Sequence, residues 1–107
     1  MHYLKLFLEL CKEKNIHVII EQSPFAEVSK GGITESFERE YFAFLNSFKE
    51  AFPEIEVVSN FSYYDDNFFC DGHHMNNNGN AVWTQYIKEK YIEPYIKNKK
   101  VLLEEEK

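Results

Sequence analysis

Acid–base chemistry is concentrated in one short segment, residues 69–79, which reads Phe-Cys-Asp-Gly-His-His-Met-Asn-Asn-Asn-Gly. Asp71 and His74 lie three residues apart across Gly72, and a glycine permits the tight turn that brings a carboxylate against an imidazole. A carboxylate that is bonded to one ring nitrogen fixes the histidine tautomer, so that the other nitrogen acts as a base. The spacing therefore predicts an Asp71–His74 pair with acid–base character.

The same segment opens a helix. Asn76 is suited to cap the N-terminus of that helix, and Gly79 allows the helix to pack closely against the sheet. The simplest alternative to a reactive pair is that Asp71 and His74 are loop residues that only cap this helix.

The pattern Asp-x-x-His-x-Asn-x-x-Gly, placed before an amphipathic helix that carries an aromatic residue, resembles the last block of the SGNH (GDSL-type) hydrolase superfamily. In that family the Asp and the His of this block complete a Ser-His-Asp triad for ester hydrolysis or acyl transfer. The resemblance implies that Asp71 is the orienting acid, that His74 is the general base and that His73 has no role. It implies no cofactor, and its substrate class is an ester or an acylated small molecule or glycan.

Two other parts of the family's site have no counterpart in this chain. The family's nucleophile lies in a Gly-Asp-Ser block after the first strand, and its further oxyanion donors lie in a Gly-x-Asn-Asp block; the run at residues 65–67 does not match the latter. Acyl transfer needs both a nucleophile and donors aimed at the oxyanion. We therefore expect the chain to be the C-terminal part of an SGNH-type esterase or acyltransferase, contributing only the Asp–His half of the triad.

Other reactive side chains are weaker candidates. Cys70 and His73 have the spacing of half a zinc site, but no second pair of ligands at comparable spacing appears, so we expect no metal. Ser23, Ser59 and Ser62 lie at strand ends or in loops and are stand-in candidates for the nucleophile. No glycine-flanked elbow surrounds these serines, and serine is a common turn residue.

Helices and short buried strands alternate along the chain. Apolar residues spaced as one helical face predict three helices, and β-branched runs predict two buried strands between them. The helices are expected at about 3–14, 35–52 and 76–93, and the strands at 16–21 and 55–59. Pro94 is expected to kink or end the third helix.

This order predicts an α/β fold with parallel strands and right-handed crossovers. Together with the resemblance, it indicates a partial flavodoxin-like three-layer sandwich, the C-terminal half of an SGNH-hydrolase fold, spanning residues 1–107 as one domain or domain fragment. We expect 25–32 to be a loop and 60–75 to be irregular. The irregular segment holds aromatic residues that either wall an acyl or glycan pocket beside His74 or cover the sheet edge; these are Phe61, Tyr63, Tyr64, Phe68 and Phe69.

Two parallel strands leave both edges of their sheet open, and neither strand has an internal proline or an inward lysine to block further pairing. The first helix, apolar on more than one side, also needs more cover than two strands supply. We therefore expect the chain to form a homo-oligomer or to bind a complementary N-terminal half. The alternative function is a catalytically silent α/β module that pairs through this exposed edge. An upstream reading frame that encodes a Gly-Asp-Ser block would favour the esterase over the interaction module.

Length and composition limit the classes of protein to which the chain can belong. The 107 residues match one domain, and a chain that is 44% hydrophobic and 17% aromatic is not a disordered tail. Twelve basic against 18 acidic residues give a net charge of −6, which disfavours nucleic-acid binding. No apolar run approaches the roughly 20 residues of a membrane span, and no signal peptide is expected. Two cysteines, Cys11 and Cys70, predict reduced thiols, and we expect a chain made alone to be soluble and cytoplasmic.

Overall fold

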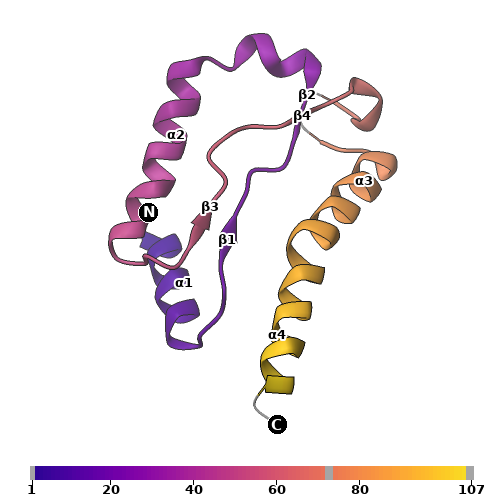
Figure 1. The fold of residues 1–107 in the computed structure, drawn as a ribbon. Coiled ribbons are helices and arrows are strands. Elements are labelled where there is room, and N and C mark those ends of the chain that lie inside the picture. The colour runs from indigo at the N-terminus through magenta and orange to yellow at the C-terminus, as the bar shows by residue number, and fades with distance from the viewer. Residues whose placement is uncertain (1, 72–73, 106–107) are drawn as a thin grey trace.

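The chain folds into a mixed α/β structure, in which two short parallel strand pairs lie among helices (Figure 1). The computed structural model describes residues 2–71 and 74–105. The helices are α1 (His2–Glu13), α2 (Glu35–Ser47), α3 (Asn77–Ile87) and α4 (Glu93–Glu105), and the strands are β1 (Ile19–Ile20), β2 (Phe25–Ala26), β3 (Glu56–Val57) and β4 (Tyr63–Tyr64). Short 3₁₀ helices lie at Glu27–Gly32, Phe48–Glu50 and Asp66–Phe68, and a π-helical turn at Lys88–Ile92 joins α3 to α4.

Local chemistry fixes the ends of the first two helices. The Thr34 hydroxyl accepts a hydrogen bond from the Phe37 N–H (3.1 Å) and so caps the N-terminus of α2. After α1 the chain turns at Asn15, whose φ of 56° lies in the left-handed region that asparagine tolerates. The N–H of Ile16 then reaches back to the carbonyl of Cys11 (2.8 Å). Both helices begin within about a residue of the positions that the apolar spacing predicts, but α2 ends at Ser47, before residue 52, and passes into the 3₁₀ turn Phe48–Glu50.

The two strands expected from β-branched runs pair in parallel, as the sequence predicts. Ile19 lies opposite Glu56, and Ile20 lies opposite Val57. The N–H of Val58 donates to the carbonyl of Ile20 (2.9 Å) and carries the ladder slightly further. The paired part is nevertheless much shorter than the β-branched runs that predict it.

The expectation that 25–32 is a loop and 60–75 irregular is wrong in one respect, because these segments form a second parallel pair. Phe25 of β2 lies opposite Tyr63 of β4. Pro24 lies between β1 and β2 and has no N–H to donate, so the ladder breaks there. The register shifts by one residue between the two pairs. The four strands therefore form one line of parallel pairing that is interrupted at Pro24.

Two clusters of buried side chains hold α1 and α2 to the strands. One cluster consists of Leu8, Phe52 and Ile55, and the other of Phe42, Leu45 and Phe61. Leu4, Ile20 and Val57 pack against both clusters and join them. No described side chain of α3 or α4 belongs to either cluster. These two helices instead run along the side of β1 that faces away from β3 (Figure 1).

The molecule is expanded for its length. Its radius of gyration is 16.7 Å, whereas a compact domain of ~100 residues has about 13 Å. The outer face of α1 is uncovered, with Tyr3 83% and Phe7 55% exposed. Among the described residues no strand neighbours β1 on its side away from β3. None of the described helices is long and apolar enough to cross a membrane.

Pro94 does not end the third helix at residue 93, which excludes one of the two outcomes expected for it; a π-helical turn interrupts the regular α-helix ahead of the proline. The proline has no N–H for the carbonyl of Lys90, and its ring would clash with that carbonyl in a regular α-helix. The chain accommodates it with the π-helical turn before it, in which the Glu93 N–H donates to the carbonyl of Lys88, five residues back. The helix then continues as α4.

Candidate functional site

The structure brings Asp71 and His74 together in two hydrogen bonds. One carboxylate oxygen of Asp71 accepts from the backbone N–H of His74 (2.7 Å), and the other lies 2.7 Å from the ring nitrogen Nδ1. Bonding of an Asp side chain to a following backbone N–H is a common local turn, and here it sets the distance between the two side chains. Both expected members of the acid–base pair therefore occupy one site.

This geometry distinguishes the two nitrogens of the imidazole. A carboxylate beside Nδ1 favours the tautomer that carries its proton there, so that Nε2 is the atom that takes up a further proton. The His74 side chain is 68% exposed and that of Asp71 52% exposed, so the pair faces solvent. A pair of this kind can accept a proton, hold the resulting imidazolium beside a carboxylate and return the proton.

The two arms of the segment that carries the pair are hydrogen-bonded to each other. Phe69 and Met75 form an antiparallel bridge, and the N–H of Cys70 donates to the carbonyl of His74 (2.8 Å). Gly72 and His73 lie outside the described residues. The expectations that His73 has no role and that Cys70 and His73 do not bind zinc therefore stay predictions.

Asn76 ties this segment to α3. Its side-chain oxygen accepts from the Gly79 N–H (3.0 Å), as expected for an N-cap, and its side-chain amide donates to the carbonyl of Asn67 (2.7 Å). Its backbone N–H donates to the carbonyl of Phe68 (2.9 Å). One residue thus joins α3, the preceding 3₁₀ helix and the Asp–His segment.

Gly79 allows a close approach, but not to the sheet as the sequence suggests. A Cβ atom at this position would lie 2.2 Å from the carbonyl oxygen of Phe68 and 3.1 Å from the Cβ of Met75. The first turn of α3 therefore packs directly on the backbone that precedes the Asp–His segment, and a side chain has no room there.

Two of the three stand-in serines contact neighbouring side-chain amides. Ser59 Oγ accepts from the side-chain amide of Asn46 (3.0 Å), and Ser23 Oγ lies 3.4 Å from the amide of Gln22. Ser62 is half-buried. Among residues 2–71 and 74–105, no group of three or more His, Cys, Asp or Glu side chains has the arrangement of a metal site.

Two of the aromatic residues of 60–75 lie in the core, and two others pair with each other. Phe61 is 7% exposed and belongs to the cluster with Phe42, and Tyr63 packs against that cluster, so these two are part of the core. Tyr64 and Phe68 form an edge-to-face pair with ring centroids 6.1 Å apart on the side of the chain that leads to α3. Whether they wall a pocket beside His74 stays a prediction.

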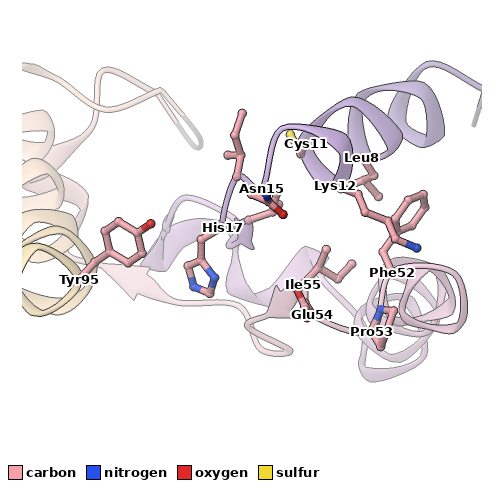
Figure 2. A pocket seen from close by; sticks show the side chains of 12 residues that line it. Leu8, Cys11, Lys12, Asn15, His17, Phe52, Pro53, Glu54, Ile55 and Tyr95 are labelled. Carbon is pink, nitrogen blue, oxygen red and sulfur yellow. The ribbon is translucent and has the colours of Figure 1, made fainter. Parts of the chain in front are cut away.

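A cavity of about 590 Å³ lies at the other end of the strands (Figure 2). It is open to solvent and is lined by the C-terminal part of α1, by residues that precede β1 and β3, and by Tyr95 of α4. The rings of His17 and Tyr95 stack there, with centroids 5.7 Å apart, and His17 Nε2 lies 3.4 Å from a carboxylate oxygen of Glu56. The cavity contains neither Asp71 nor His74 and is therefore separate from the acid–base pair.

One cluster of side chains was not predicted from the sequence. Glu21, the residue after β1, accepts hydrogen bonds from the hydroxyls of Tyr86 and Tyr91. A charged residue directly after a run of Val and Ile was the available signal. Its partners could not be read from the pattern, because they lie more than sixty residues along the chain.

Comparison with models of known protein families, with curated proteins and with solved structures found no match to this chain. The resemblance to the SGNH superfamily therefore stands on residues 71–79 and on the order of the elements alone.

The contact between Gly79 and Phe68 predicts that Gly79→Ala destabilises the fold. Overpacking of this kind costs about 1–3 kcal/mol, because the new methyl group must displace a backbone carbonyl. Gly32→Ala is the matched control, since a Cβ there meets nothing within 4 Å. Urea unfolding measures both variants. Equal unfolding free energies for the two would show that α3 does not pack on Phe68 in this way.

Proposed function

We propose that this chain is the C-terminal part of an SGNH-type serine esterase or acyltransferase and that it supplies Asp71 and His74 to a Ser-His-Asp triad. The observation that carries the proposal is the double hydrogen bond between these two residues. An aspartate that only capped α3 would need no imidazole partner, and the cap of α3 is already provided by Asn76.

In this mechanism a serine from outside the chain attacks the carbonyl carbon of the ester. Nε2 of His74 takes the serine proton as the C–O bond forms, and Asp71 stabilises the imidazolium through Nδ1. Collapse of the tetrahedral intermediate breaks the bond to the leaving alkoxide, which receives the proton from His74. Water or an acceptor alcohol then repeats the sequence on the acyl-enzyme. The substrate class is an ester or an acylated small molecule or glycan, and no cofactor takes part.

We further propose that the fold is part of a flavodoxin-like sandwich whose sheet continues beyond β1. Three features support this. The edge of β1 away from β3 has no described strand beside it, α3 and α4 run along that same side, and the outer face of α1 is exposed. A complementary N-terminal half, which would also carry the serine, covers these surfaces in this proposal; a second copy of the chain is the other candidate.

A catalytically silent interaction module is the second candidate function. The observation that favours it is the exposed apolar face of α1, where Tyr3, Leu6, Phe7 and Leu10 are between 46% and 83% exposed. Exposed apolar surface of this kind marks sites of protein association. An interaction module of this kind explains the open strand edge but does not explain the pairing of Asp71 with His74.

The isolated chain is predicted to be a poor hydrolase, because it carries no serine elbow or oxyanion donors. Its turnover of p-nitrophenyl acetate is expected to fall by less than about tenfold in His74→Ala, whereas a complete triad loses on the order of 10⁶-fold when its histidine is removed. His17→Ala is the control for imidazole elsewhere in the chain.

Robust turnover that His74→Ala abolishes would contradict the half-site proposal. It would show that the chain contains its own nucleophile, and Ser23, Ser59 and Ser62 would then be replaced singly to find it.

The exposed edge and helix face predict that the isolated chain does not stay a monomer. Light scattering at micromolar concentration is expected to give a mass above that of one chain, because self-pairing covers part of the open strand edge and of α1. A monodisperse monomer with a cooperative thermal transition would show that the helices alone complete the fold, and the proposed continuation of the sheet would lose its main support.

A further inference from the structure

One carboxylate attaches the helix that follows the Asp–His segment to the strands. Glu21 comes directly after β1 and is half-buried. One of its oxygens accepts from the Tyr86 hydroxyl (2.9 Å), and the other accepts from the Tyr91 hydroxyl (2.5 Å). The rings of Tyr86 and Tyr91 pack edge to face, with centroids 6.1 Å apart. We call Glu21, Tyr86 and Tyr91 the tyrosine clamp.

Other charged and titratable groups face the same carboxylate. Lys90 Nζ donates to the Tyr86 hydroxyl (2.7 Å) and so polarises one arm of the clamp. Burial and the hydrogen bond to Glu21 raise the pKa of Tyr91 above its ordinary value, which keeps this hydroxyl protonated and able to donate. Burial and the neighbouring Tyr86 and Glu21 also raise the pKa of Tyr64, on β4. Tyr91 is thus held in the neutral form in which its hydroxyl donates to Glu21.

The π-helical turn makes this clamp possible. In a regular α-helix, residues five apart point about 140° away from each other around the axis. The π-helical turn at Lys88–Ile92 takes up one extra residue, so Tyr86 and Tyr91 reach the same carboxylate. Pro94 cannot donate to the carbonyl of Lys90 and so disfavours a regular turn at this point. The proline, the turn and the clamp form one structural unit.

The clamp holds this helix to the strands outside the apolar core. No described side chain of α3 or α4 belongs to the two core clusters, so the apolar core does not fix the position of this helix relative to the strands. At its N-terminus the helix is tied to the adjoining chain through Asn76 and Gly79. Farther along, the ring of Tyr95 stacks on that of His17, which precedes β1.

We infer that Glu21 is a positioning residue for the Asp71–His74 pair: by holding Tyr86 and Tyr91 it fixes α3, and with it the segment that α3 begins from, at the carboxyl end of β1. In open parallel sheets this is the end at which reacting groups gather. The inference rests on the proposed function, because that is what gives the placement of His74 a chemical meaning.

The test compares the orientation of α3 with that of α2 in the full-length chain. One-bond N–H residual dipolar couplings report whether two helices share one rigid frame. In the unsubstituted chain we expect the couplings of α2 and α3 to fit a single alignment tensor. In the double variant Tyr86→Phe, Tyr91→Phe, which keeps both rings and removes both hydroxyls, we expect this common fit to be lost.

Tyr41→Phe is the matched control. Its hydroxyl donates to the side chain of Gln22 (2.9 Å), one residue after Glu21, but it belongs to α2. We expect the control to keep the common fit. If the double variant does not fold, Glu21→Gln, which keeps the side-chain shape and one acceptor, is measured in its place and is expected to weaken the common fit.

A second readout separates positioning from general destabilisation. The Asp71–His74 bond is local, so the tautomer of His74, read from long-range ¹H–¹⁵N correlations, is expected to be the same in the double variant and in the unsubstituted chain. An unchanged common fit in the double variant overturns the inference. A lost fit together with a changed tautomer also overturns it, because the clamp would then build the pair rather than place it. Neither readout uses catalysis, so failure of the proposed function would show in the ester assay and leave these results standing.

Discussion

Parallel pairing of β1 with β3 is the constraint on which the other contacts depend. Parallel strands need a long crossover, and α2 supplies it while its apolar side chains, with those of α1, cover the strands. The pairing also sends both strands out in the same direction, so Glu21 and the chain that leads to Asp71 leave from one end of the sheet. The candidate site follows β4 and the 3₁₀ helix at Asp66–Phe68 along the chain.

Two carboxylates make the contacts that position His74, one between residues close in the sequence and one between residues far apart. Asp71 acts locally: it bonds the backbone and the ring of a residue three positions away, and it would do so in almost any fold that keeps the turn. Glu21 makes contacts between residues far apart in the sequence. It follows β1 and accepts hydrogen bonds from Tyr86 of α3 and from Tyr91 of the π-helical turn. The first contact selects the nitrogen of His74 that takes a proton, and the second contact places that histidine relative to the strands.

Features that depend on local pattern could be predicted from the sequence. These include α1 and α2, the N-cap roles of Thr34 and Asn76, the pairing of the two β-branched runs, and the closeness of Asp71 to His74. The second strand pair could not be predicted, because Pro24 interrupts the ladder and the paired aromatics have no regular spacing. The sequence left open whether Pro94 kinks or ends the helix, and the π-helical turn before it could not be predicted, since such a turn has no sequence signature as clear as the proline itself. Glu21 shows the same limit, because its partners are set by tertiary structure.

The tautomer of His74 shows whether Asp71 orients the imidazole as a base. Long-range ¹H–¹⁵N correlation spectra near pH 8.5, about two units above the ordinary pKa of histidine, distinguish a ring protonated at Nδ1 from one protonated at Nε2. We expect His74 to carry its proton on Nδ1 and to lose this preference in Asp71→Ala. His17 is an internal control, because its contact with Glu56 is made through Nε2, and its spectrum should not change. A His74 protonated at Nε2 in the unsubstituted chain would show that Asp71 does not orient the base.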